Sequence, residues 1–272
     1  MAAAERRQAI DLHHWEKRAI PRFSLDRGFE FSSVVDRGER QCLLQSVLLA
    51  ALLQKSGSDA GAVMVFRNGA GEESNIGHVV TLLKLSNGRD VLTDASHKEP
   101  FVRYTGLFAR VRGFGYRFVE PIFASGTQDI VAYRLVATGR RTPLSSVRGL
   151  DTAYLRSQFA YYRGERTPGG ILSGRPTSVG LEVQAKRLRE SLAQCSANPI
   201  STYLLGRVCL KMGRLSEAYS LLDRACRLYR EAGWVPIDPQ EALVRARSAV
   251  AREVAAGSRP AGRTSSSRAN RG

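Results

Sequence analysis

The sequence predicts an α+β domain followed by an all-α domain, and three patterns lead to this prediction. An apolar run with helical spacing, residues 40–55, comes early in the chain and is followed by several short runs with strand character. From residue 181 onward the apolar residues recur at helical spacing only. The intervening segment is dense in Gly, Pro, Ser and Thr, as linkers are. The resulting division is an α+β domain at 1–163, a linker at 164–180, a helical domain at 181–254 and a disordered basic tail at 255–272.

The α+β region begins with helical character and continues with strands. Residues 5–18 are expected to form a short helix. Residues 40–55 place Leu and Val at helical spacing up to Gly57, a residue type that commonly ends helices. Five later runs have the composition of strands: residues 61–67, 77–85, 89–96, 115–123 and 129–137. A helix that precedes a set of neighbouring strands favours a helix packed on an antiparallel sheet.

The helical region contains one recognisable repeat among its expected helices, which are residues 181–194, 200–212, 215–231 and 239–254. Small and apolar residues stand at the spacing of a tetratricopeptide repeat: Leu205, Gly206, Gly213, Ala218, Leu222 and Ala225. Gly206 and Ala218 would let paired helices approach closely, and Gly213 would lie in the turn between them. Cys209 stands where a Tyr is usual, so a generic helical hairpin is the alternative. One such pair does not bury its apolar face alone, and we expect its neighbours to cover it.

The chain carries a formal net charge of +16, and residues 255–272 hold four Arg and no acid. Such a charge attracts polyanions non-specifically. Aromatic residues do not interleave with the basic ones, so specific nucleic-acid binding is not expected. No run approaches the ~20 apolar residues that span a bilayer, and the N-terminus lacks the apolar region of a secretory signal. We therefore predict a cytoplasmic protein without membrane contact.

The four cysteines show no metal-binding pattern, because no C-x-x-C occurs and their spacings are long. In a reducing compartment they are expected to be free thiols. Cys195, Cys209 and Cys226 lie in helical patterns, where cysteine commonly behaves as a small buried apolar residue. We expect neither a cofactor nor a metal ion.

Cys42, His78 and Asp94 form a candidate catalytic triad. Cys42 falls at or near the first turn of the expected helix, where peptide dipoles favour a negative sulfur and a backbone N–H is free to bind an oxyanion. His78 opens one strand and Asp94 closes the next, so a sheet would hold the base and the carboxylate rigidly. The imidazole would take the thiol proton and return it to the leaving group, while the carboxylate orients the ring.

The loop between the two strands, residues 86–88, decides whether this triad can form. An Asn-Gly pair between apolar runs indicates a hairpin. A symmetric two-residue loop would place His78 and Asp94 on opposite faces, because side chains alternate along strands. We therefore predict an odd-length loop or a bulge, with Gly88 in a left-handed conformation.

Each triad residue also has an ordinary structural interpretation. Cys42 could be a buried helix cysteine, His78 a core-edge histidine bonded to backbone, and Asp94 a turn cap. His97 is a rival for the base, but it lies beyond the strand end. A zinc site built from Cys42, His78, Asp94 and His97 is a further alternative, although no pair of these has the short spacing usual for zinc ligands.

Residues 38–97 resemble the transglutaminase-like superfamily of cysteine acyl-transfer enzymes, in which a Cys opens an apolar helix, a His opens a strand and an Asp closes the next. The matching segments are GERQCLLQSVLLAALLQKSGSDAGAVMVF, GHVVTLL and VLTDAS. The resemblance implies a papain-like α+β core with Cys42 as nucleophile, His78 as base and Asp94 as orienting carboxylate. Two departures fall in the substrate cleft: Arg40 stands where the family often has Gly, and a Val follows the His where an aromatic residue is common.

These observations predict a cysteine-dependent hydrolase or acyltransferase, protease-, amidase- or transglutaminase-like, that acts on amide bonds of a peptide or protein substrate. The order of the two regions also resembles a known bacterial pairing of such a core with tetratricopeptide helices, which would bind a protein partner. The alternative is a non-catalytic tetratricopeptide-type adaptor with an inactive transglutaminase-like domain.

Overall fold

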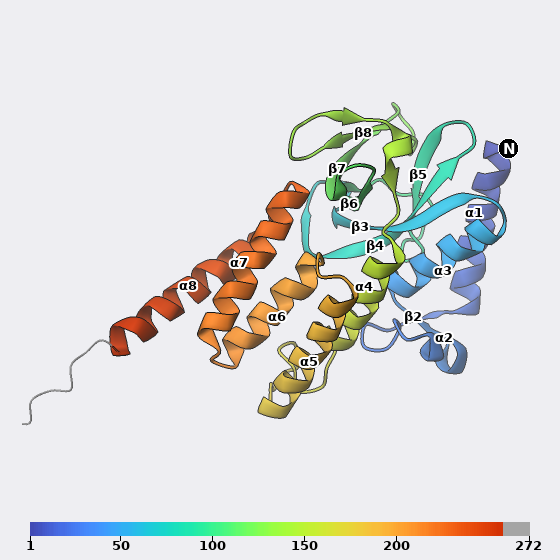
Figure 1. Cartoon of the computed structure of the whole chain (residues 1–272). Helices are drawn as coiled ribbons and strands as arrows, with labels where there is room; N and C mark the ends of the chain where they lie inside the picture. Colours follow the sequence, from blue (N-terminus) through green and yellow to red (C-terminus); the bar gives the residue numbers. More distant parts are fainter. Residues whose placement is uncertain (258–272) are drawn as a thin grey trace, which may run out of the picture.

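A computed structural model describes residues 1–257, apart from the side chains of residues 74–76 (Figure 1). The chain begins with helix α1 (Ala2–Ala19). Two short strands, β1 (Arg22–Phe23) and β2 (Glu39–Arg40), pair in parallel on either side of helix α2 (Phe31–Arg37). Strand β2 leads directly into helix α3 (Cys42–Lys55), so the strand pair fixes where α3 begins.

Eight antiparallel strands follow α3 and form one sheet. They are β3 (Asp59–Arg67), β4 (Glu73–Leu85), β5 (Arg89–Thr93), β6 (Thr105–Val111), β7 (Gly115–Phe123), β8 (Ile130–Leu135), β9 (Arg141–Thr142) and β10 (Val147–Arg148). Six of them close into a barrel in the order β6-β3-β4-β5-β8-β7, because β7 pairs with both β8 and β6. Strand β9 pairs with β8, and β10 pairs with β6.

The two faces of the barrel wall belong to different apolar clusters, because side chains alternate along a strand. Val63 and Val65 of β3 lie in one cluster, while Ala62, Met64 and Phe66 of the same strand lie in another. The first cluster takes residues from all six strands and therefore fills the barrel interior. The second continues into helices α4 and α6, so the barrel and the helical region share part of their core.

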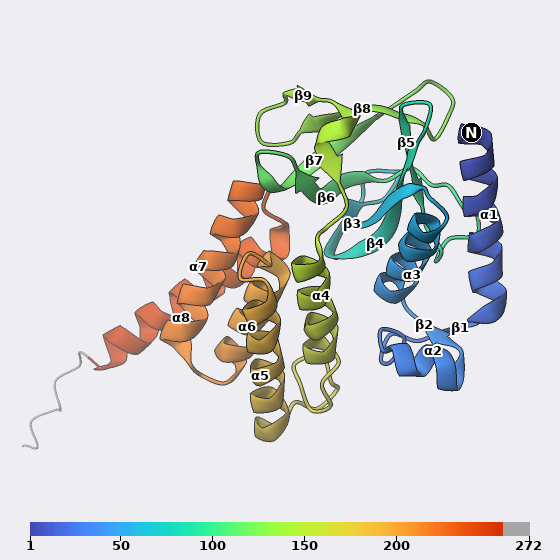
Figure 2. The same ribbon diagram turned by 45° about the vertical axis from the view of Figure 1, so that its right-hand side comes forward.

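Helix α3 packs against the outside of the barrel, and α1 in turn packs against α3 (Figure 2). Two reciprocal hydrogen bonds fix α3 to β4. The Ser46 hydroxyl donates to the Val79 carbonyl at 2.8 Å, and the Thr81 hydroxyl donates to the Ser46 carbonyl at 2.9 Å. Ser46 and Thr81 are fully buried. These bonds hold the first turn of α3 beside the middle of β4.

Helices α4 to α8 pack in chain order, each against the next. They are α4 (Thr152–Glu165), α5 (Ser178–Gln194), α6 (Pro199–Lys211), α7 (Leu215–Ala232) and α8 (Ile237–Gly257). A Cβ atom on Gly206 would lie 2.7 Å from Leu222 Cγ, so glycine is what lets α6 and α7 approach this closely. Gly213, with φ of +76°, forms the turn between them. Helix α8 projects away from the barrel (Figure 1).

The mixed helix-and-strand class, the antiparallel sheet and the helix predicted at residues 40–55 are confirmed. The barrel closure and strand β6 are findings that the sequence analysis does not anticipate. A papain-like core, a tetratricopeptide repeat and the division at residues 164–180 stay predictions. The predicted tail, residues 255–272, lies outside the described residues except for 255–257, which end α8.

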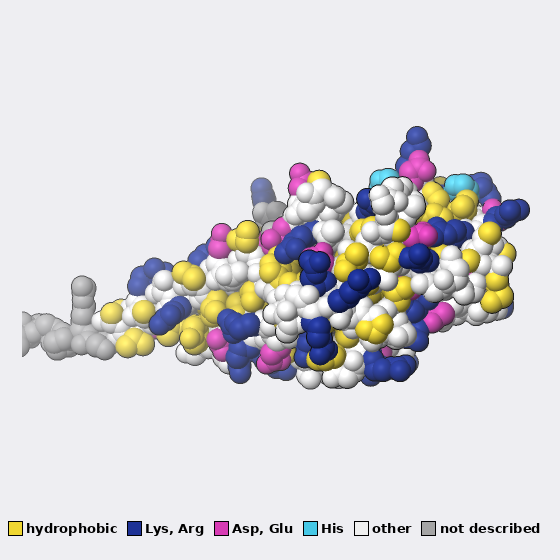
Figure 3. All heavy atoms as spheres, turned by 90° about the horizontal axis from the view of Figure 1, so that it is seen from above, with side chains coloured by type: hydrophobic (Ala, Val, Ile, Leu, Met, Phe, Trp, Pro, Cys, Tyr) yellow, Lys and Arg dark blue, Asp and Glu magenta, His cyan; other side chains and the backbone are white. Residues whose placement is uncertain are grey.

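None of the helices within residues 1–257 is both long enough and apolar enough to cross a membrane. Figure 3 shows Lys and Arg side chains along the length of the face seen from above, interspersed with apolar and acidic ones. The basic side chains on this face are thus scattered rather than gathered into one patch.

Candidate active site

The β4–β5 hairpin has the odd-length loop that the triad requires. Leu85 pairs with Arg89 and Thr81 pairs with Thr93, which leaves a three-residue loop at 86–88. Gly88 adopts φ of +72°, in the left-handed region. The predicted irregularity is confirmed. Because of this register, His78 and the residue that follows β5, Asp94, lie on the same face of the hairpin.

The His78 ring and the Asp94 carboxylate are in direct contact, with His78 Nε2 at 2.9 Å from Asp94 Oδ2. The Tyr104 hydroxyl donates to the same oxygen at 2.5 Å, and the Ser96 backbone N–H donates to Oδ1 at 2.8 Å. The Asp94 side chain is only 2% exposed. Burial alone would raise the pKa of this carboxyl, but the hydrogen bonds from His78, Tyr104 and Ser96 hold the pKa below its usual range. Asp94 is therefore an anion that orients the imidazole.

Cys42 is the first residue of α3, after Gln41 at the N-cap. Its sulfur interacts with the His78 ring and accepts a hydrogen bond from the Val79 N–H, and the Tyr162 hydroxyl lies 3.7 Å away. Burial alone would raise the pKa of the thiol, but the hydrogen bond and charge of His78, with Val79 and Tyr162, hold the pKa below its usual value. Since Asp94 occupies Nε2, Nδ1 is the ring nitrogen left for the sulfur.

His78 is held in its protonated form by its two neighbours. Burial alone would lower the pKa of the imidazole, but the hydrogen bond to Asp94 and the interaction with Cys42 raise the pKa to about 10. A lowered thiol pKa beside a raised imidazole pKa favours a thiolate–imidazolium pair at neutral pH. Such a pair can attack a carbonyl carbon and protonate the departing group.

A cavity of about 440 Å³ opens beside His78 and Asp94, and Cys42 does not line it. Side chains at the ends of β3 and β4, the Asp94 loop and Tyr104 line it: Val65, Arg67, Asn68, Glu72, Glu73, His78, Asp94, Ser96, His97 and Tyr104. The His78 side chain is 26% exposed, whereas Cys42 is 8% exposed. The imidazole is thus the part of the triad that faces solvent, and the thiol lies deeper.

Helix α1 supports the Asp94 loop from behind. The His13 ring is fully buried, and its Nε2 lies 3.2 Å from the carbonyl oxygens of both Asp94 and His97. Because carbonyl oxygens only accept, His13 must carry its proton on Nε2. The rival base, His97, accepts a hydrogen bond from the Glu99 N–H at Nδ1 (3.0 Å), and its carbonyl is bound by His13. His97 therefore caps a turn, and His78 is the histidine beside the sulfur.

The structure brings the three predicted residues together at the first turn of α3. Among the residues it describes, no group of three or more His, Cys, Asp or Glu side chains is arranged to hold a metal ion. All four cysteines are free thiols. Burial raises the pKa of Cys209 to about 11 and raises the pKa of Cys226 as well, so these two thiols are unreactive by comparison.

Three further residues at the site are missing from the sequence prediction, namely Ser46, Tyr104 and Tyr162. Ser46 leaves a signal, since a hydroxyl inside an apolar helix run needs a buried partner. Tyr104 and Tyr162 leave none, because their proximity to Asp94 and Cys42 depends on where β6 joins the barrel and on how α4 packs against it.

Comparisons of the chain with protein-family models, with curated proteins and with solved structures found no match.

Proposed function

We propose that this chain is a cysteine-dependent hydrolase or acyltransferase that acts on amide bonds through Cys42, His78 and Asp94. The observation that carries the proposal is the position of the His78 ring, which contacts Asp94 at 2.9 Å and also interacts with the Cys42 sulfur. The resemblance of residues 38–97 to the transglutaminase-like superfamily supports the same reaction class and a papain-like core.

The reaction would proceed by covalent catalysis. The Cys42 thiolate attacks the amide carbonyl carbon, a C–S bond forms, and the π electrons move to the carbonyl oxygen. When the C=O bond re-forms, the C–N bond breaks and the amine leaves with the proton from the His78 imidazolium. Neutral His78 then takes a proton from water or an amine, which attacks the thioester and releases the acylated product and the free enzyme.

The helical region would serve recognition in this proposal. Helices α4 to α8 stack in chain order, as helical-repeat proteins do, and α6–α7 has the close glycine contact expected of a tetratricopeptide pair. We propose that this region binds a protein partner or a protein substrate.

Selective alkylation tests the proposal. Iodoacetamide reacts with thiolates, so at pH 6.5 we expect Cys42 to be modified on the order of 100-fold faster than Cys195, Cys209 or Cys226, as followed by peptide mass spectrometry. Turnover of p-nitrophenyl acetate should accompany this reactivity and be lost in Cys42→Ser, whose hydroxyl is not activated in the same way. Cys209→Ser is the matched control and should keep turnover.

Equal or slower alkylation at Cys42, together with no turnover, would contradict the enzymatic proposal. The function left would be a non-catalytic adaptor that works through its stacked helices.

A further inference from the structure

We infer that Tyr162 is a catalytic residue whose hydroxyl, with the Cys42 backbone N–H, binds the oxyanion formed when the thiolate attacks. This inference rests on the proposed function and assigns a fourth residue to the same reaction. Tyr162 comes from α4, which the sequence gives no reason to place at the thiol.

The position of the hydroxyl fits this role. Tyr162 Oη lies 3.7 Å from Cys42 Sγ, on a side chain that is 4% exposed. If a carbonyl carbon were bonded to the Cys42 sulfur, its oxygen would lie within reach of the Tyr162 hydroxyl, because an oxyanion needs a donor only about 2.7–3.1 Å away. The second donor is the Cys42 N–H, which at the first position of α3 has no partner within the helix.

The Tyr162 phenol keeps its proton, as a hydrogen-bond donor to an oxyanion must. Burial and the negative charge of the Cys42 sulfur raise the pKa of the phenol well above its usual value, so the hydroxyl keeps its proton. An interaction with the Gln41 side chain offsets part of this rise in the pKa. The hydroxyl can therefore donate its hydrogen to the sulfur, 3.7 Å away, and after attack to an oxygen on the carbon bonded to that sulfur.

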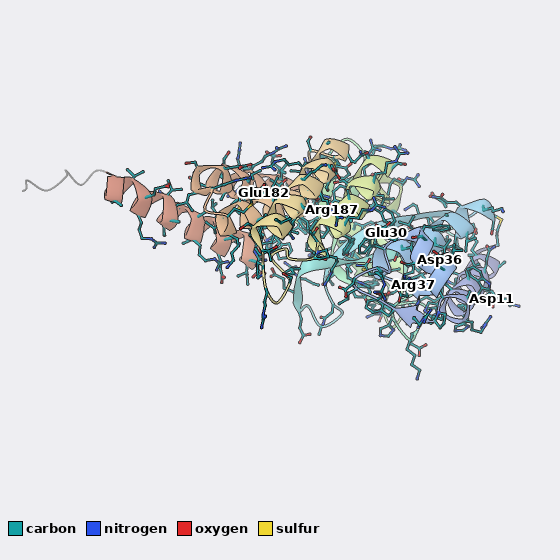
Figure 4. The ribbon with its side chains drawn as sticks, turned by 90° about the horizontal axis from the view of Figure 1, so that it is seen from below. Asp11, Glu30, Asp36, Arg37, Glu182 and Arg187 are labelled. Atoms are coloured by element: carbon teal, nitrogen blue, oxygen red, sulfur yellow. The ribbon has the colours of Figure 1, made fainter. Side chains whose placement is uncertain are left out.

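Neighbouring contacts hold the ring in place, as an oxyanion donor requires. The Phe29 ring stacks on Tyr162, with centroids 5.8 Å apart and planes 17° from parallel. The next residue of α4, Arg163, binds both oxygens of Glu30 at 2.6 and 2.9 Å. Arg187 of α5 adds a second positive charge beside Glu30 (Figure 4). The segment that contains Phe29 is thereby tied to α4, and Tyr162 is fixed from both sides.

Each step of the reaction gives Tyr162 a defined task. In the resting state its hydroxyl faces the thiolate. On attack the negative charge moves from sulfur to the carbonyl oxygen, and the hydroxyl donates to that oxygen instead. On collapse the C=O bond re-forms and the charge is lost. Tyr162 gives up no proton at any step, so its raised pKa is compatible with the role.

The test compares two reactions of Cys42 in Tyr162→Phe, which removes one oxygen atom and keeps the ring. Alkylation by iodoacetamide forms no oxyanion, whereas acylation by p-nitrophenyl acetate does. We expect the acylation rate to fall about 100-fold and the alkylation rate at pH 8 to change less than about threefold. Tyr161→Phe is the matched control, since the neighbouring Tyr161 hydroxyl bonds Glu165 instead, and both rates should stay at the wild-type value.

A parallel fall of both rates would overturn the inference, because Tyr162 would then act only on the thiolate or on the fold. Unchanged rates would overturn it as well. Unselective alkylation of the wild-type protein would instead refute the proposed function itself, and the inference with it. Circular dichroism checks folding, and Gln41→Leu supplies a second variant in which the same difference between the two rates should appear, at roughly tenfold.

Discussion

Cys42 and Cys209 are both buried cysteines, but their thiol pKa values are shifted in opposite directions. Cys42 is the first residue of α3, beside His78, and its thiol pKa is lowered. Cys209 lies within α6, where burial and the nearby carboxylate of Glu217 raise the pKa to about 11. Both side chains are largely shielded from solvent, at 8% and 0% exposure. Burial therefore does not decide reactivity, and the neighbouring charge and the position along the helix do.

The surroundings of the two thiols differ in the same way. The α3–β4 contact contains two buried hydroxyls, of Ser46 and Thr81, and each donates a hydrogen bond to a backbone carbonyl. The α6–α7 contact depends on Gly206 against Leu222. Buried polar groups cost free energy unless they are paired, so the paired groups near Cys42 fix the position of α3 against the sheet.

The largest expected effect is on stability at the α6–α7 contact. Leu222 is fully buried, so Leu222→Ala should lower the free energy of unfolding by about 2–5 kcal/mol through lost burial and a cavity. Urea unfolding measures the loss. The Cys42 alkylation rate of the folded variant should equal that of the wild type, and a changed rate would show that the two regions are coupled.

The second-largest expected effect is the loss of the difference in alkylation rate between Cys42 and Cys209 when His78 is replaced. His78→Ala deletes the charge and the hydrogen bond that lower the Cys42 pKa, so the thiol should return to a pKa near or above ~8.5. At pH 6.5 iodoacetamide should then react roughly 100-fold more slowly at Cys42, and no faster than at Cys209. Retention of fast alkylation in this variant would mean that α3 itself, not His78, activates the sulfur.

The Cys42–His78 pair should also make the stability of the protein depend on pH in a way that Cys209 does not. In the unfolded chain His and Cys titrate near 6.5 and 8.5, whereas the folded pair keeps one proton, on His78, up to about pH 10. Below pH ~6.5 the unfolded chain binds one proton more than the folded pair, so the pair's contribution to the free energy of unfolding rises with pH. Above pH ~8.5 the unfolded chain binds one proton fewer than the folded pair, so this contribution falls as the pH rises through about 10.

The difference in unfolding free energy between wild type and Cys42→Ser should accordingly be largest near pH 8, and about 1–2 kcal/mol smaller at pH 6 and pH 10. Urea titrations at the three pH values measure it. Cys209→Ser is the control, and its difference from wild type should show no such maximum.

The smallest expected effect concerns the bonds that fix α3 to β4. Ser46→Ala removes a buried donor to the Val79 carbonyl and should cost about 1–2 kcal/mol in the free energy of unfolding. The same change should slow alkylation of Cys42 only slightly, since the Thr81 bond to the Ser46 carbonyl remains. A loss of alkylation as large as that of His78→Ala would show that both bonds are needed to align the sulfur.

The parts of the site that could be predicted from the sequence are those with local signals. Cys42 at a helix start, Asp94 directly after a strand and the odd loop with Gly88 all follow from periodicity and turn chemistry. The prediction that His78 opens a strand is wrong, because β4 begins at Glu73, in a segment whose polar residues and glycines indicate a loop. Strand β6 escaped prediction because Gly106, at φ of +60°, interrupts its apolar pattern near the start. The barrel closure escaped because it depends on β7 pairing with two strands at once. Tyr162 is 120 residues from Cys42, and no spacing rule connects the two.

The contact between His13 and the Asp94 loop makes α1 part of the support of the proposed site. Removing α1 would leave two backbone carbonyls, of Asp94 and His97, without their shared donor and would uncover one side of α3. A shortened chain that begins at β1 would keep Cys42, His78 and Asp94 but would lose the contacts of His13 with the backbone of the Asp94 loop. A truncation or fusion at α1 should therefore change the position of Asp94 as well as the stability of the fold.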